Sequence, residues 1–133
     1  MARHSTPDAG GRARPLLDFV TQMIAREDNV LRAIRESTAS KGLPAISVGP
    51  DEGRLLHFLA TACGAKKIVE VGTLAGYSAC WLARSLPKGG MLHTIEYDPR
   101  HAQVAKENIA LAGLTAKVSV HTGAGMDVLP RLS

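Results

Sequence analysis

Two glycines and an acidic side chain follow short apolar runs of this 133-residue chain at a spacing typical of nucleotide sites. In the segment 67–78, KIVEVGTLAGYS, a β-branched run leads into Gly72 and Gly76, and glycine after a strand lets the backbone approach a ligand. Glu96 ends the next apolar run, on the order of 20 residues beyond the glycines, where a carboxylate can accept hydrogen bonds from both ribose hydroxyls. The spacing therefore predicts a site for an adenosine-containing ligand.

The glycine loop restricts which ligand fits. It lacks the middle glycine of the G-x-G-x-x-G pattern, because Thr73 and Leu74 place Cβ atoms where a pyrophosphate would approach the backbone. A smaller, uncharged linker fits better, and S-adenosylmethionine has one. Two alternatives stay open: half of an NAD-dependent oxidoreductase domain, and a non-enzymatic interaction module that pairs through an open strand edge.

Four further residues are candidates for the same site. Glu70 lies inside the first strand, where a carboxylate is costly unless it is hydrogen-bonded, so we expect a structural role first and contact with the cofactor's ammonium end as the alternative. The Ser78 hydroxyl can cap the following helix or bind the amino-acid portion of the ligand. Gly123 and Ala124 follow the third strand and are small enough for an adenine ring to lie against them.

Apolar periodicity and turn residues define the expected elements. Residues 1–14 read as a disordered tail, residues 15–38 as two helical stripes, and residues 41–50 as a loop. A helix from Asp51 to about Gly64 is expected to bury a face made of Leu55, Leu56, Phe58, Leu59 and Ala62. Strands are predicted at 68–71, 91–96 and 117–122, with helices at 79–85, from Asp98 to Gly113, and after Gly125.

This order of elements predicts an α/β fold with a Rossmann-like, doubly wound parallel sheet. Right-handed crossovers place the strands in the order 3-2-1, which is only the first half of such a sheet, preceded by N-terminal helices. The apolar first strand would then have one bare edge, an aggregation liability unless something covers it. We therefore expect a truncated or split piece of a protein, or a chain that pairs with a second copy.

Composition excludes several other classes of protein. The net charge is +4 and the pI about 9.4, but the basic residues are scattered and aromatic residues are few, which disfavours a nucleic-acid partner. No apolar run is long enough to span a membrane, and residues 1–14 contain no apolar segment of the kind a secretory signal needs, so a cytoplasmic location is expected. Cys63 and Cys80 are expected to be buried free thiols, and the five histidines to be surface or core groups rather than zinc ligands or catalysts.

Several motifs, in the right order, resemble the metal-dependent O-methyltransferases of the catechol and caffeoyl-coenzyme A type. Residues 68–79 are similar to the cofactor motif of that family, residues 26–38 to its N-terminal helices, and residues 47–53 to the loop before the helix that precedes the first strand. Residues 94–99 and 123–124 are similar to its ribose and adenine loops. The resemblance implies that the methionine portion of the cofactor contacts Ser47, Val48, Gly72, Thr73 and Ser78, and that Gly76 and Tyr77 shape the loop around it. It also implies that Glu96 holds the ribose and that the adenine lies between Tyr97 on one side and Gly123 and Ala124 on the other.

The same resemblance implies a reaction. S-adenosylmethionine would donate its methyl group to a hydroxyl of a small, catechol-like acceptor, and a divalent cation such as Mg²⁺ would bind two adjacent acceptor oxygens. In the family, the metal ligands and the catalytic lysine follow the third strand, so none of them is expected in this chain. We therefore expect residues 15–133 to be the N-terminal part of a methyltransferase domain. Such a part would form a homodimer or pair with a C-terminal half, and would not methylate alone.

Overall fold

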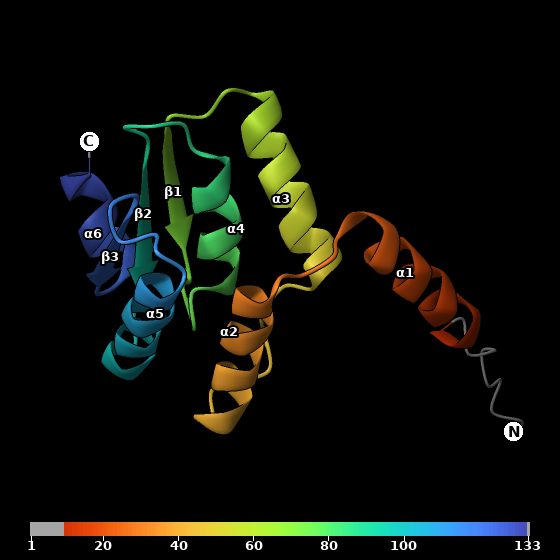
Figure 1. Cartoon of the computed structure of the whole chain (residues 1–133). Coiled ribbons are helices and arrows are strands. Elements are labelled where there is room, and N and C mark those ends of the chain that lie inside the picture. Colours follow the sequence, from red (N-terminus) through yellow and green to blue (C-terminus); the bar gives the residue numbers. More distant parts are fainter. Residues whose placement is uncertain (1–9, 133) are drawn as a thin grey trace, which may run out of the picture.

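The computed structural model describes residues 10–132, with the side chains of residues 10–14 outside the description. Figure 1 shows three helices leading into a small sheet that alternates with further helices. The elements are α1 (Gly10–Ile24), α2 (Asn29–Ser40), α3 (Pro50–Ala62), β1 (Lys67–Val71), α4 (Tyr77–Ser85), β2 (Met91–Glu96), α5 (Pro99–Leu111), β3 (Val118–Thr122), α6 (Gly125–Val128) and the 3-10 helix η1 (Leu129–Arg131). No helix among these described residues has the length and apolarity that a membrane span requires.

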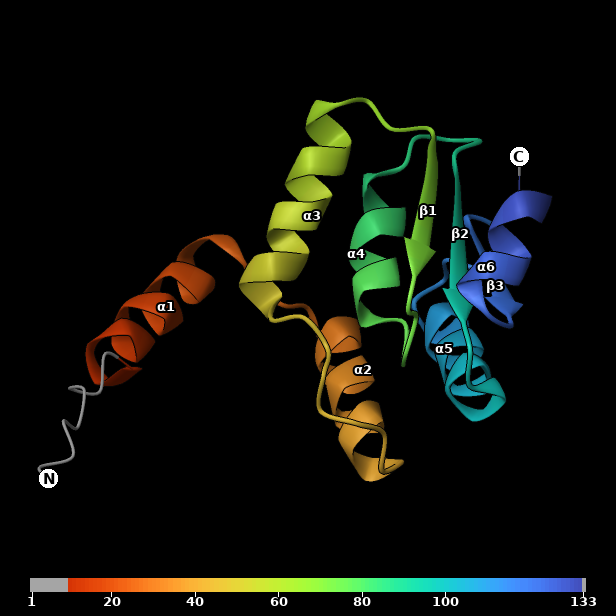
Figure 2. The same ribbon diagram turned by 180° about the vertical axis from the view of Figure 1, so that it is seen from behind.

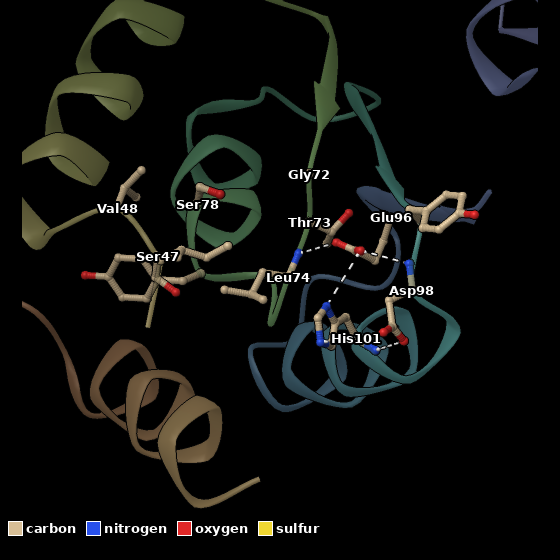
Figure 3. Close-up of a pocket in the computed structure, with 12 residues that line it drawn as sticks. Ser47, Val48, Gly72, Thr73, Leu74, Ser78, Glu96, Asp98 and His101 are labelled. Atoms are coloured by element: carbon tan, nitrogen blue, oxygen red, sulfur yellow. Dashed lines mark hydrogen bonds and ion pairs between the residues drawn. The ribbon is translucent and has the colours of Figure 1, made fainter. Parts of the chain in front are cut away.

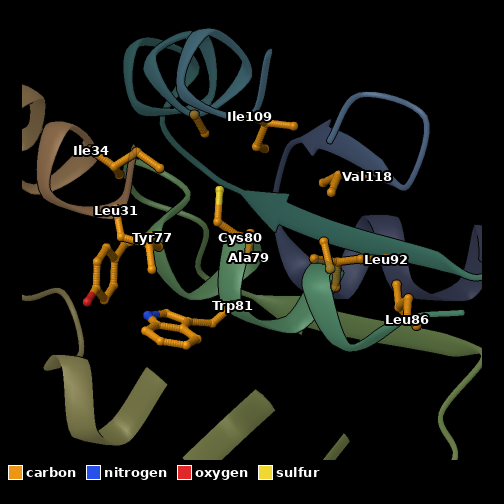
Figure 4. Close-up of a cluster of buried hydrophobic side chains, with 12 residues drawn as sticks. Leu31, Ile34, Tyr77, Ala79, Cys80, Trp81, Leu86, Leu92, Ile109 and Val118 are labelled. Carbon is orange, nitrogen blue, oxygen red and sulfur yellow. The ribbon is translucent and has the colours of Figure 1, made fainter. Parts of the chain in front are cut away.

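The three strands form one parallel sheet in the order β1-β2-β3, which confirms the predicted α/β fold and strand order. The core lies where α4 and α5 pack on this sheet, as Figure 4 shows for Cys80, Leu92 and Ile109. Leu31 and Ile34 extend the core from α2 toward α4. The sheet and α4 therefore hold a fixed frame for the loops at the carboxyl ends of the strands.

Strand β1 differs in one respect from the buried strand that its composition predicts. It lies at the edge of the sheet, so the bare edge is confirmed, but its residues alternate between exposed and half-buried. Val71 is 62% exposed and Val69 is also exposed. A β-branched run is buried on both faces only when both neighbours and both covering layers are present, and among residues 10–132 β1 has one neighbouring strand.

The N-terminal helices also depart from expectation. Helix α1 begins at Gly10, inside the range predicted as a disordered tail, while residues 1–9 lie outside the described part. The predicted burial of the α3 face is wrong, because Leu55, Phe58, Leu59 and Ala62 are exposed and Leu56 is only half-buried. The reason is that α3 packs against α4 through its small residues: Gly53 and Ala60 are its buried residues. Figures 1 and 2 show α1 projecting from α3, away from the sheet.

The two cysteines have different surroundings. Cys63 is exposed, so its predicted burial is wrong: it is the C-cap residue of α3, beyond the last turn that packs on α4. Cys80 is buried in the core as predicted, and burial raises the pKa of its thiol to about 12. Both thiols are free, as expected.

Candidate functional site

A cavity of about 450 Å³ opens at the carboxyl ends of β1 and β2 (Figure 3). The loop after β1 forms one wall, the end of β2 and the first turn of α5 form another, and the loop before α3 closes the third side. Its lining residues are Ile46, Ser47, Val48, Gly72, Thr73, Leu74, Tyr77, Ser78, Glu96, Tyr97, Asp98 and His101. Such a crevice outside the strand ends is where open α/β sheets bind ligands.

The loop after β1 has a backbone that depends on glycine. Gly72 adopts φ +95° and its N–H donates to the carbonyl of Ile95 at 2.8 Å, which ties the loop to β2. Gly76 adopts φ +83° as the N-cap of α4, and a Cβ there would lie 3.5 Å from Ala105 of α5. These conformations favour glycine because a side chain in the left-handed region is strained. The loop is therefore held close to both β2 and α5.

Glu96 connects the two walls of the cavity. One carboxylate oxygen accepts from the N–H of Leu74 at 2.7 Å and the other from the N–H of Asp98 at 3.0 Å, as the dashed lines in Figure 3 show. His101 Nδ1 lies 3.8 Å from the second oxygen. The residue is only 8% exposed. Because each carboxylate oxygen has two lone-pair positions, Glu96 can still accept from a ligand hydroxyl while it orders both loops.

Behind the loop, Glu70 takes part in a chain of hydroxyl hydrogen bonds. Its two carboxylate oxygens accept from Ser78 Oγ and Thr94 Oγ1, each at 2.6 Å, and Thr94 Oγ1 lies 2.5 Å from Thr73 Oγ1. Burial raises the pKa of Glu70, and the two hydroxyl donors partly offset that effect. Glu70 is not among the residues that line the cavity, so these contacts are structural, and its contact with a cofactor stays a prediction.

Eight of the twelve predicted cofactor residues line this one cavity: Ser47, Val48, Gly72, Thr73, Tyr77, Ser78, Glu96 and Tyr97. Glu70 and Gly76 do not line it, but Glu70 accepts from the lining residue Ser78, and Gly76 precedes the lining residue Tyr77. Gly123 and Ala124 do not line it, although the Gly123 N–H donates to the Glu96 carbonyl at 2.8 Å, which brings the β3 loop beside the end of β2. The role of all twelve residues in cofactor binding stays a prediction.

Sequence reasoning missed four lining residues: Ile46, Leu74, Asp98 and His101. Asp98 was assigned only as the N-cap of α5, a role the structure confirms through its bonds from the N–H groups of Arg100 and His101. One turn of helix brings His101 back over Glu96. The sequence did contain a signal for His101: Glu96 ends the strand, Asp98 caps the next helix, and His101 follows three residues later, on the first turn of that helix.

The described residues do not suit a divalent cation. Among residues 10–132 no group of three or more histidine, cysteine, aspartate or glutamate side chains is close enough together to hold one. The two acids in the cavity, Glu96 and Asp98, accept hydrogen bonds from backbone N–H groups instead. The acids of the cavity are therefore engaged with the backbone of the described residues.

A parallel sheet with a glycine loop after its first strand and an acid after its second defines the class of Rossmann-like nucleotide-binding domains. Within that class, residues 21–133 match the sequence model of the family described as O-methyltransferase, and the chain belongs to this family.

Relatives and solved structures agree with that placement. Over 114 residues the chain is 52% identical to the catechol O-methyltransferase of Niastella koreensis, and over 115 residues 37% identical to that of Mycobacterium tuberculosis; each match covers 86% of this chain and 52% of the relative. The O-methyltransferase from Bacillus cereus, solved with SAH, superposes with a TM-score of 0.86 at 37% identity, over 89% of this chain and 54% of that one. The O-methyltransferase TomG of Streptomyces achromogenes, solved with SAM, superposes with a TM-score of 0.84 at 36% identity, over 90% of this chain and 53% of that one. The chain thus spans about half the length of these proteins.

Proposed function

We propose that this chain supplies the cofactor-binding part of an S-adenosylmethionine-dependent O-methyltransferase. The observation that carries the proposal is the cavity in which the Gly72 loop and the Glu96 carboxylate face one another at the strand ends. Solved relatives with SAM or SAH bound support the choice of ligand. The alternative of an NAD-dependent half-domain has the weaker support, because Thr73 and Leu74 occupy the approach of a pyrophosphate.

Each wall of the cavity would hold one part of the cofactor. Glu96 would accept from the ribose hydroxyls, and Tyr97 would lie beside the adenine, with Gly123 and Ala124 near its other face. Gly72 would allow close approach of the backbone, while Ser47, Val48, Thr73 and Ser78 would surround the methionine portion. When bound, S-adenosylmethionine supplies an electrophilic methyl group on its sulfonium. The residues of this chain would orient that group and exclude water from it.

We further propose a small, catechol-like hydroxyl compound as the methyl acceptor. The two relatives named above carry the name catechol O-methyltransferase, which supports this class. Among residues 10–132 there is no cluster of three or more such ligand side chains, and in the family that the chain resembles the metal ligands follow the third strand, so the metal would be held by residues outside this part. We expect the 133-residue chain to bind the cofactor only weakly and to show no methyl transfer by itself.

Calorimetric titration with S-adenosylhomocysteine and with NAD tests this function. We expect S-adenosylhomocysteine to bind and NAD to bind at least tenfold more weakly. Glu96→Gln removes a charged acceptor from the ribose, a loss of about 1.5–3 kcal/mol that weakens binding about tenfold or more. Glu36→Gln, an exposed glutamate on α2, is the matched control and should bind like the unaltered chain. Preference for NAD, or unchanged affinity of Glu96→Gln, would contradict the proposal.

We propose that the chain associates with a second copy or with the rest of a longer protein. Two exposed apolar surfaces support this. The first, called the helix surface here, consists of Phe19, Met23, Ile24, Leu55 and Phe58 on α1 and α3. The second is the free edge of β1 with Val69 and Val71. Apolar patches and unpaired edges of this kind mark interaction sites.

We also propose a cytoplasmic location and no nucleic-acid partner. The free thiols of Cys63 and Cys80 suit a reducing compartment. The carboxylates of Glu96 and Asp98 at the cavity would repel a phosphate backbone.

A further inference from the structure

Tyr77 lines the cavity, but its hydroxyl group forms a hydrogen bond with a residue that does not. Tyr77 is the first residue of α4, is 2% exposed, and packs with Leu31 and Ile34 in the core. Its hydroxyl donates to Glu27 Oε1 at 2.8 Å. Glu27 lies in the linker between α1 and α2, fifty residues away along the chain. The cavity wall is therefore bonded directly to the N-terminal segment.

Glu27 is held in place for this contact. Its other carboxylate oxygen accepts from Arg35 on α2 at 2.6 Å, and its side chain is only 9% exposed. Burial raises the pKa of the Tyr77 phenol well above its usual value, so the hydroxyl stays protonated and remains a donor at physiological pH. The three groups form a chain in which the guanidinium balances the carboxylate and the carboxylate fixes the phenol.

Asn108 of α5 donates to the carbonyl of Ala75 just before α4, and the first turn itself is held by side chains of its own. The N-cap of α4, Gly76, has no side chain to cap the helix. Two side-chain hydrogen bonds therefore hold the first turn: Ser78 to Glu70 on β1, and Tyr77 to Glu27 on the linker. Tyr77 and Ser78 also line the cavity. The Trp81 side chain also interacts with the Tyr77 hydroxyl, but Glu27 is its charged partner, so loss of Glu27 would remove the charge-assisted bond on this side of the turn.

We propose that Glu27 is a positioning residue for the cofactor site: through Tyr77 it fixes the first turn of α4, and so sets the wall against which the methyl donor binds. The inference rests on the proposed function for the identity of that ligand. It assigns a role at the site to a linker residue that does not itself line the cavity.

Hydrogen exchange of the ligand-free chain tests the positioning directly. In Glu27→Ala and in Tyr77→Phe, the segment 73–82 should exchange about fivefold faster, since each change removes the same part-buried, charge-assisted hydrogen bond. Strand β2 (91–96) should be unaffected. Glu27→Gln keeps an oxygen that accepts from Tyr77 and should restore slow exchange to within about twofold, and Glu36→Gln is the exposed control. Unchanged exchange in 73–82, or equal acceleration in β2, would overturn the inference.

Titration with S-adenosylhomocysteine then links this role to binding. Glu27→Ala and Tyr77→Phe should each weaken the affinity about fivefold, and the double variant should be no weaker than either single one, because both remove the same contact. Additive losses would overturn the proposed coupling. If the unaltered chain fails to bind S-adenosylhomocysteine, the proposed function is contradicted, while the exchange data still decide whether Glu27 positions α4.

Discussion

Replacement of Thr94 by valine tests the buried hydroxyl chain behind the cavity. Thr94 is fully buried, and its Oγ1 donates to Glu70 Oε2 at 2.6 Å. Valine keeps the shape of the side chain but leaves that carboxylate oxygen without its donor, with Ser78 as the remaining one. Hydrogen bonds to charged groups contribute about 1.5–3 kcal/mol, so at pH 8 we expect the melting temperature to fall by about 5–10 °C for a domain of this size.

The loss should depend on pH. Burial gives Glu70 a raised pKa in the folded state, so the unfolded chain releases this proton at a lower pH than the folded chain does. The contribution of Glu70 to stability is therefore fully present below its unfolded pKa and is lost as the pH rises through the folded pKa. Thr94→Val raises the folded pKa further, because the ionised form loses a donor.

Calorimetric melting at pH 5 and at pH 8 measures this difference. The drop caused by Thr94→Val should be smaller at pH 5 than at pH 8, because more of Glu70 is protonated at the lower pH. Thr61→Val is the matched control: the exposed Thr61 hydroxyl donates to the carbonyl of His57 rather than to a carboxylate, so its small effect should be the same at both pH values. Equal drops for Thr94→Val at pH 5 and pH 8 would refute the role given to Glu70.

Two further changes probe the packing and the exposed surfaces. Gly53→Ala places a Cβ into the Trp81 indole, and we expect it to lower the free energy of unfolding by about 1–3 kcal/mol and to shift the fluorescence of this single tryptophan. Gly125→Ala is the control, because its Cβ meets only Val71, at 3.2 Å, and it should melt almost normally. A larger loss in Gly125→Ala than in Gly53→Ala would contradict the α3–α4 contact. Light scattering measures whether two copies associate. If they pair through the helix surface, Phe58→Lys should reduce the measured mass to that of one chain, and if they pair through the β1 edge, Val71→Lys should do so. Association that survives both changes would contradict these two surfaces.

Local chemistry made much of this architecture predictable from the sequence. An aspartate followed by proline, as in Asp98–Pro99, favours the start of a helix through local interactions alone, and α5 does begin there. Right-handed crossovers fix the order of three alternating strands, so the β1-β2-β3 sheet and the meeting of Gly72 with Glu96 follow from connection lengths. These features depend on few distant contacts.

Features that depend on neighbours were less predictable. Periodicity selects large apolar residues such as Phe58 as the buried face of α3, but the helix packs through Gly53 because the indole of Trp81 needs that space. Phe58 is consequently 61% exposed. The composition of β1 indicates burial, yet exposure is set by the layers around a strand. His101 reaches the cavity only because the first turn of α5 folds back over Glu96.

Backbone amide NMR of the labelled chain, titrated with S-adenosylhomocysteine, tests most directly whether an adenosyl methyl donor binds between the β1 loop and the end of β2. The largest shifts are predicted at Gly72, Leu74 and Tyr97, which line opposite walls of the cavity. Saturable shifts confined to α1 and α3, or no shifts at these three amides, would contradict the assignment of this cavity as the cofactor site.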